Sequence, residues 1–396
     1  MNKKINLAVA GAVLFAASAA NAGIIIPAGE WTLDVGGNVN HFMIMDQRDD
    51  NLAITGGLAT TNGSAGQGED RTSQNTGLLP SWLGFTGTTR QNDLDVSFSI
   101  SFQPGTSSTG ALSGGSGAPE NRTAFITFGD KSWGTVKVGK DLGIFGSDAI
   151  LSDMTLLGVG STGAATGNGT NTTLGHIGTG YLYADWKGQF SYTTPNMNGF
   201  QATVGIMQPW AAEGDTYVAT TGTTPMSSAT GTDHEQYGYE GKASYTMSMG
   251  KVWVGFAQQD MDSLTYGSAA TAVGSDSLQA YEIGANVNVG NLGLVGYYYT
   301  GEGAGTTGFG VDAFDSAGKA RDSDGLFVQA TYVVPTGTKV GVSYGRSDLD
   351  ATAADTALLA ATYNLVSRNE MWTVGAYHPL TKHLNLVAEY NNSTSE

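Results

Sequence analysis

Apolar and polar residues alternate along many short stretches of this chain. In residues 93–103, Leu94, Val96, Phe98, Ile100 and Phe102 alternate with aspartate and serine. Successive side chains of a β-strand point to opposite faces, so this stretch predicts a strand with one apolar and one polar face. The pattern recurs in residues 31–45, 237–247, 281–289, 326–332, 340–344 and 384–390. No comparable helical period is found beyond the N-terminal segment.

Short and long connections alternate between the predicted strands. The short ones are residues 89–92, 130–133, 195–198, 249–250, 290–291, 335–337 and 379–383. The long ones are approximately residues 46–80, 104–121, 141–185, 209–235, 260–277, 301–323 and 347–368. Long loops at one end only are typical of outer-membrane barrels. We therefore expect an all-β protein, a transmembrane antiparallel up-and-down β-barrel of about 16 strands with long external loops and short periplasmic turns.

The strand count leaves two alternatives open. About fifteen strands can be counted, whereas single-chain bacterial barrels have an even number. If the N-terminus is periplasmic, residues 384–391 run outward, and a last strand would be missing after Glu396. The other count makes residues 357–366 a strand and 367–369 a turn, which closes the barrel at sixteen. We favour a fragment with fifteen strands, because residues 379–383 resemble the other short turns.

The first 22 residues have the features of a secretory signal peptide. Lys3 and Lys4 precede the apolar residues 5–19, and Ala20 and Ala22 are suited to a cleavage site. The apolar run is shorter than the roughly 20 residues that a membrane helix needs. We therefore divide the chain into a signal peptide, residues 1–22, and a barrel, residues 23–396, which is exported through the periplasm to the outer membrane.

Composition excludes several classes of function. The net charge of −17 argues against a nucleic-acid partner, because phosphate groups are neutralised by clustered Lys and Arg. The absence of cysteine excludes disulfides, thiolate metal sites and a Cys nucleophile. Among the five histidines only His378 and His383 approach metal-ligand spacing, and they flank a predicted turn. We expect no cofactor, no metal site and no enzymatic activity, and His41 is the residue we would test for a barrel enzyme.

Two predicted hairpins carry a family resemblance. Residues 128–140 (FGDKSWGTVKVGK) and 191–200 (SYTTPNMNGF) are similar to the hairpins that flank the third loop of Gram-negative general porins. The rhythm of strands and loops resembles the same diffusion porins over most of the chain. The resemblance implies that loop three, approximately residues 141–185, folds into the barrel and narrows the pore. In our count this loop joins the fifth and sixth strands.

The resemblance also implies which residues form the constriction. Residues 139–154 are similar to the third loop of enterobacterial porins, which gives Lys140 the basic role and Asp153 an acidic one. Leu156 and Leu157 stand where the family has a second carboxylate, so either the electric field across the constriction is weaker than in the family or Asp148 completes the site. Strict alternation would point Lys140 at lipid, where a charge costs about 2–4 kcal/mol at the midplane. We therefore expect the strand to bend or end before Lys140.

Further charged residues fall on the polar faces of the predicted strands. They are the candidates Asp34, Arg90, Asp93, Asp95, Lys137 and Glu282. Carboxylates outnumber basic groups in this set and in loop three, so we predict mild cation selectivity.

The expected function is passive diffusion of small hydrophilic solutes and ions across the outer membrane. The family implies a homotrimer, with outer-membrane lipid and lipopolysaccharide around it. The alternatives are a substrate-specific outer-membrane channel and, less favoured, a barrel enzyme or an adhesin that binds through its long loops.

Overall fold

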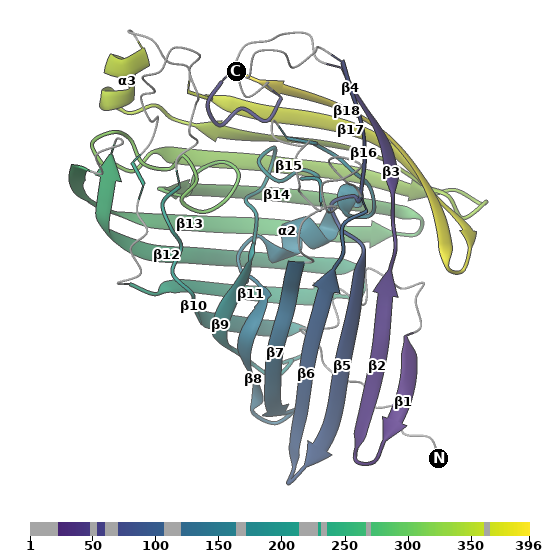
Figure 1. Cartoon of the computed structure of the whole chain (residues 1–396). Coiled ribbons are helices and arrows are strands. Elements are labelled where there is room, and N and C mark those ends of the chain that lie inside the picture. The colour runs from purple at the N-terminus through teal and green to yellow at the C-terminus, as the bar shows by residue number, and fades with distance from the viewer. Residues whose placement is uncertain are drawn as a thin grey trace, which may run out of the picture.

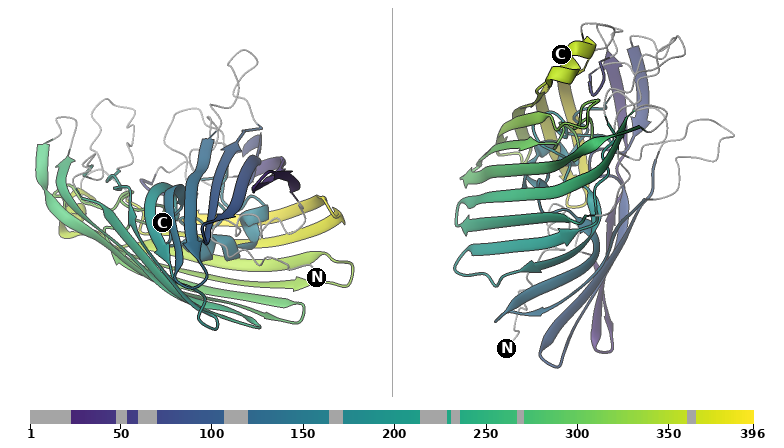
Figure 2. Two further views of the ribbon diagram at one scale, coloured as in Figure 1. Left: turned by 90° about the horizontal axis from the view of Figure 1, so that it is seen from below. Right: turned by 90° about the vertical axis from the view of Figure 1, so that its left-hand side faces the viewer.

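The computed structural model describes residues 23–47, 54–59, 70–106, 120–163, 172–213, 229–230, 236–266, 271–359 and 365–396. The signal peptide predicted for residues 1–22 lies outside them. The described chain is dominated by one antiparallel sheet of sixteen strands, in which each strand pairs with its neighbours in the chain order β1, β2, then β5 to β18. The sheet curls around a helix-containing segment on its concave side (Figures 1 and 2). This is the predicted up-and-down barrel architecture.

The strands and helices have the following bounds. The sheet contains β1 (Ile24–Ala28), β2 (Trp31–Asn38), β5 (Trp82–Gln91), β6 (Leu94–Gln103), β7 (Glu120–Asp130), β8 (Gly134–Leu142), β9 (Trp186–Thr193), β10 (Phe200–Met207), β11 (Gly238–Met247), β12 (Gly250–Tyr266), β13 (Thr271–Val289), β14 (Leu292–Glu302), β15 (Asp322–Val333), β16 (Lys339–Leu349), β17 (Arg368–Thr381) and β18 (Leu384–Ser395). A separate hairpin and three short helices are β3 (Phe42–Gln47), β4 (Asp70–Asn75), α2 (Ser147–Ser152), η1 (Met154–Leu157) and α3 (Ala353–Leu359).

The predicted asymmetry of the connections is confirmed. At one end of the sheet, strands are joined by tight turns such as Asn92 and Asp93, whose φ angles of 48° and 62° suit a two-residue hairpin between β5 and β6. Long connections leave the other end. One of them is shorter than predicted: residues 260–277 were expected to form a loop, but β12 extends to Tyr266 and β13 begins at Thr271. The two strands stay paired out to Tyr266 and Thr271, across two register shifts.

The sixteenth strand is β1, at the opposite end of the chain from the one the sequence suggested. Residues Ile24–Ala28 pair with β2, whereas the sequence count began at residue 31 and placed the missing strand after Glu396. The alternative strand at residues 357–366 is wrong, because its first residues belong to α3 and residues 360–364 lie outside the described chain. The preferred turn at residues 379–383 is confirmed by the β17–β18 hairpin. With β1 counted, loop three joins the sixth and seventh strands of the sheet.

The two faces of the sheet differ as the alternation predicts. On β12, Val252, Val254 and Phe256 are exposed on the outer face, whereas Trp253 and Ala257 are each 2% exposed on the inner one. The buried apolar cluster lies on this inner side and combines β12–β15 with loop three. In the part of the chain that is described, no helix is long and apolar enough to cross a membrane.

Candidate pore constriction

Loop three, residues 143–185, enters the concave side of the sheet and holds α2 and η1 (Figure 1). The chain turns into α2 at Gly146, whose φ of 73° is a left-handed conformation that glycine adopts without strain. Phe145, Ala149, Tyr181 and Leu182 of this loop have no exposed surface and belong to the inner apolar cluster. The loop therefore packs as an interior element rather than covering the rim.

Inward carboxylates of the sheet hold the first half of loop three. Glu240 on β11 accepts hydrogen bonds from the backbone N–H groups of Ile144 and Phe145, the latter at 3.1 Å. Glu282 on β13 accepts one from Gly146 at 2.9 Å. Buried backbone N–H groups need partners, and a charged acceptor makes a stronger bond than a neutral one. The loop entrance is thus fixed to two strands far from it in sequence.

Other inward groups hold the second half of loop three. Glu389 on β18 accepts hydrogen bonds from the N–H groups of Val159 and Gly160, at 2.8 and 2.9 Å. The ring of His176 lies 2.8 Å from the hydroxyl of Ser343 on β16, and the burial of this ring lowers its pKa. Loop three is therefore anchored from β11 around to β18.

A second connection also fills the interior. Residues 303–321 follow β14, and the ring of Phe309 stacks on Trp210 at 4.8 Å and meets Phe145 edge-on at 5.2 Å. The carbonyl of Thr307 accepts a hydrogen bond of 2.8 Å from the N–H of Tyr183 in loop three. The space beside β12–β15 is consequently packed with protein, and the open space lies on the other side of loop three.

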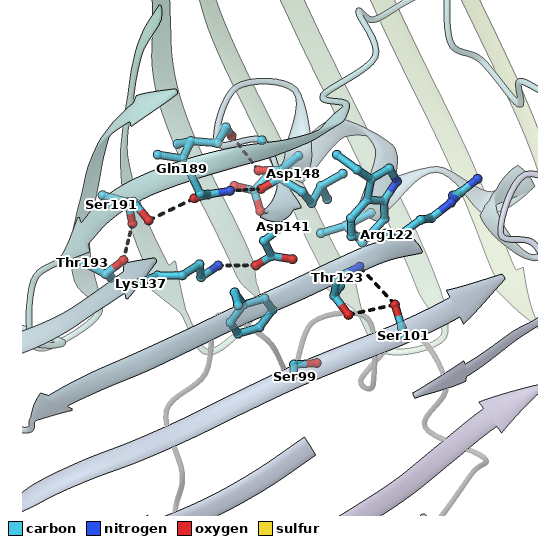
Figure 3. A pocket seen from close by; sticks show the side chains of 18 of the residues that line it. Ser99, Ser101, Arg122, Thr123, Lys137, Asp141, Asp148, Gln189, Ser191 and Thr193 are labelled. Carbon is cyan, nitrogen blue, oxygen red and sulfur yellow. Dashed lines mark hydrogen bonds and ion pairs between the residues drawn. The ribbon is translucent and has the colours of Figure 1, made fainter. Parts of the chain in front are cut away.

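That open space is a cavity between loop three and strands β5 to β12 (Figure 3). Half of the strand residues in its wall are uncharged and polar, with hydroxyl and amide side chains at Ser99, Ser101, Gln103, Thr123, Gln189, Ser191, Thr193, Gln201, Thr203 and Ser244. Several of these groups bond to one another, such as Thr123 with Ser101 at 2.8 Å and Ser191 with Gln189 at 3.0 Å. A wall of this kind offers hydrogen bonds to water and to dissolved solutes.

Six charged side chains line the cavity. Asp148 of α2 forms ion pairs with Lys242 on β11 at 2.6 Å and with Lys251 on β12 at 2.5 Å. Burial by itself would raise the pKa of Asp148, but the two ammonium groups lower it below its ordinary value, so the carboxylate is ionised. Lys137 on β8 pairs with Asp141 and lies over the ring of Phe125. The sixth is Arg122 of β7.

The structure brings only part of the predicted constriction together. Asp148 lies at the cavity as expected. Lys140 does not: β8 continues to Leu142 instead of ending earlier, and Lys140 is an exposed residue in the phase of Val138, which pairs with the exposed Ile126 and Phe190. The predicted bend and the predicted basic role of Lys140 are therefore wrong.

Asp153 serves the loop itself. Its carboxylate accepts hydrogen bonds from the N–H and hydroxyl of Thr155, the N–H of His176 and the hydroxyl of Tyr181, at 2.6–3.2 Å. The residue is 4% exposed and none of the cavity-lining bases pairs with it. The role predicted for Asp153 at the constriction is corrected: its buried carboxylate ties three parts of loop three together.

The remaining candidates divide between the cavity and the turns. Lys137 lines the cavity as predicted. Arg90 instead sits near the tight turns, where it pairs with Asp95 at 2.7 Å and Asp130 at 2.9 Å and lies 4.0 Å from Asp93. The three carboxylates therefore share Arg90 as their basic neighbour, and none of them lines the cavity.

Two candidates from other parts of the chain have different surroundings. Glu282 faces inward, but it is buried against loop three and the hydroxyl of Tyr297. His41, the residue considered for an enzyme, contacts the uncharged side chains of Thr106 and Gln74. In the residues with assigned positions, no group of His and carboxylate side chains could hold a metal ion.

The sequence interpretation missed the basic residues of the cavity, Arg122, Lys242 and Lys251. The signal for Lys242 was available, since it shares the polar phase of residues 237–247 with Glu240 and Ser244. Arg122 directly follows the loop predicted for residues 104–121 and was not singled out; it belongs to β7, which begins at Glu120, and its guanidinium lies 5.6 Å from the ring of Trp186.

Comparison with known proteins agrees with this architecture. Residues 8–396 match the family described as Gram-negative porin. The chain belongs to this family. Among curated proteins, no sequence matches the chain. The porin is similar in fold to the outer membrane channel DcaP of Acinetobacter baumannii, with a TM-score of 0.61 and 16% identity over 95% of this chain and 94% of that one.

Two further solved structures show the same fold. The Salmonella typhi OmpF complex with daunomycin has a TM-score of 0.54 and 14% identity, over 93% of this porin and 92% of OmpF. OmpT of Vibrio cholerae in its trimer form has a TM-score of 0.53 and 13% identity, over 92% and 89% of the two chains. At these identities the likeness concerns the fold alone.

Proposed function

We propose that this porin is a passive channel for small hydrophilic solutes and ions across the outer membrane. The observation that carries the proposal is the cavity between loop three and β5–β12, which is lined by polar side chains inside a sheet with an apolar outer face. Solutes would pass along hydroxyl, amide and charged groups that replace part of their hydration. Loop three, with Asp148, would form the narrowest part of the path.

The surroundings of the channel are part of the same proposal. The predicted signal peptide, residues 1–22, would direct export, and lipid and lipopolysaccharide would contact the exposed apolar side chains of the outer face. A homotrimer is supported by the trimer form of the similar OmpT structure.

The cation selectivity expected from the sequence receives no support from the cavity. Four basic side chains line it, Arg122, Lys137, Lys242 and Lys251, against the two carboxylates of Asp141 and Asp148. The sequence count included Asp93 and Asp95, which face Arg90 near the tight turns, and Asp153, which is buried in loop three. The proposed general channel does not depend on this selectivity.

Liposome swelling tests the proposal. Purified protein, shown to be folded by its altered electrophoretic mobility before heating, is incorporated into liposomes that are then diluted into isotonic sugars of increasing size. We expect rapid swelling with monosaccharides and slower swelling with larger sugars, because the path is open but narrowed by loop three. Liposomes that stay intact in the smallest sugars, although they contain folded protein, would contradict the proposal.

A further inference from the structure

A pair of lysines on neighbouring strands shares a single carboxylate at the cavity. We propose that Lys242 and Lys251 form a transient binding site for small hydroxylated organic carboxylates that pass through the channel. The inference rests on the proposed channel function and adds a class of solute to it. It also reverses the sign of the selectivity expected from the sequence.

The charges at the site do not cancel. The two ammonium groups lie 2.6 and 2.5 Å from different oxygens of Asp148, so two positive charges face one negative charge at the cavity wall. Glu282 is the other carboxylate whose charge acts on Lys242, but it is buried against Gly146 and Tyr297 and does not line the cavity. The neighbouring Lys137 and Asp141 form a one-to-one pair. An anion that enters the cavity therefore meets an excess positive charge, in a space where walls of low dielectric constant weaken screening by solvent.

The fourth base of the cavity has a carboxylate partner outside the lining. Arg122 pairs with Glu120, at 2.9 Å, but Glu120 is not among the residues that line the cavity and its side chain is 51% exposed. The guanidinium also lies over the ring of Trp186, which lines the same space. The lining groups carry four positive and two negative charges, and with Glu120 included the local balance is +1, in a chain whose total charge is −17.

The lysines keep hydrogen-bonding capacity for a ligand. Each ammonium group has three N–H donors. Lys242 contacts Asp148 and the hydroxyl of Ser147, at 2.9 Å, and Lys251 contacts Asp148. Three of the six donors are therefore used by the side chains around them. A carboxylate can accept the others without breaking the existing pairs.

The uncharged wall indicates the rest of the ligand. Thr203 is the cross-strand partner of Lys242, and Gln201 and Ser244 line the cavity next to it. These groups donate and accept hydrogen bonds, and so match hydroxyl groups on a solute that carries one carboxylate. Asp148 competes for the same lysines, which keeps binding weak enough for release, as conduction requires.

Single-channel recording with gluconate as the probe tests the inference. We expect gluconate to reduce the chloride current of the native channel and the reversal potential in a KCl gradient to favour chloride. In K251Q, which leaves the Lys242–Asp148 pair intact, the gluconate concentration that halves the current should rise about threefold, because one positive charge has left the site. K140Q removes the same charge from the outer face and should behave like the native channel.

A second variant, D148N, should strengthen the block by gluconate, and a stronger block cannot result from a loss of folding. D148N removes the competing negative charge, so gluconate should block at about threefold lower concentration. Equal block in the native channel, K251Q and D148N, or a reversal potential that favours potassium in the native channel, would overturn the lysine site while leaving the channel intact. Absence of any conductance from folded protein would instead reject the proposed function.

Discussion

Replacing the carboxylate of Asp153 should loosen loop three without opening the sheet. In the native protein Oδ2 of Asp153 accepts three hydrogen bonds, and Oδ1 accepts one from the N–H of Thr155 at 2.8 Å. In D153N the amide oxygen can accept the same three bonds, but the amide nitrogen takes the place of Oδ1 and cannot accept from Thr155. A buried donor without an acceptor costs about 1–3 kcal/mol. D153A removes all four bonds, and the two from the fully buried His176 and Tyr181 alone cost about 2–6 kcal/mol.

Hydrogen exchange read by mass spectrometry measures this effect directly. Peptides from residues 150–163 and 172–182 should exchange about 5–150 times faster in D153N than in the native protein, and faster still in D153A, if local opening limits exchange. Peptides from β12–β15 should be unchanged. D93N is the matched control, because the side chain of Asp93 is fully exposed in a tight turn where asparagine is well tolerated. Unchanged exchange in loop three of D153A would refute the role assigned to Asp153.

Three further predictions concern the buried anchors. E240A removes the carboxylate that lies 2.8 Å from the ammonium group of Lys187, whose side chain is only 3% exposed. The free energy of unfolding in detergent should therefore fall by about 3–5 kcal/mol, because a buried charge is left unpaired. The E240A/K187M double variant should recover part of this loss. Burial lowers the pKa of His176 and keeps its ring neutral, so the folded protein should lose stability as the pH drops below the ordinary histidine pKa of about 6.5. H176Q should reduce the fall of the melting temperature between pH 8 and pH 5. An equal fall in the native protein and in H176Q would contradict this prediction. D355N weakens the buried ion pair between Asp355 of α3 and Arg321, whose atoms lie 2.7 Å apart, and should speed proteolysis of α3 and of residues 303–321. The swelling rate of liposomes that contain D355N should stay within twofold of the native rate, because the cavity beside loop three is formed by other residues.

The repeated features of the fold were predictable because they are local. Alternation in residues 93–103 predicted β6, and the turn residues that follow the strands predicted the hairpins. Strand β1 was missed because Ile24, Ile25 and Ile26 form an unbroken apolar run, and all residues of β1 are exposed, so no alternation marks the strand. The tops of β12 and β13 were taken for a loop because their Gly, Ser and Asp content has low strand propensity, which pairing overrides.

The candidate site was only partly predictable because the pairing register and the curvature of the sheet bring its residues together from distant parts of the chain. Asp148 could be selected from its loop, but its partners Lys242 and Lys251 follow about a hundred residues later and meet it only through the curvature of the sheet. The assignment of Lys140 came from likeness to other porins, while the alternation of β8 itself pointed that side chain outward. Here the local pattern was the better guide.

The central claim, that solutes pass between loop three and the polar wall of β5–β12, can be tested at one atom. The chain has no cysteine, so S244C introduces a unique thiol at the cavity lining. Single-channel current is recorded in planar bilayers before and after addition of a charged, membrane-impermeant methanethiosulfonate. We predict a lasting stepwise fall in the current of S244C, with no change in the cysteine-free channel or in Y245C on the outer face. A steady current through S244C after confirmed modification of the thiol would contradict the account.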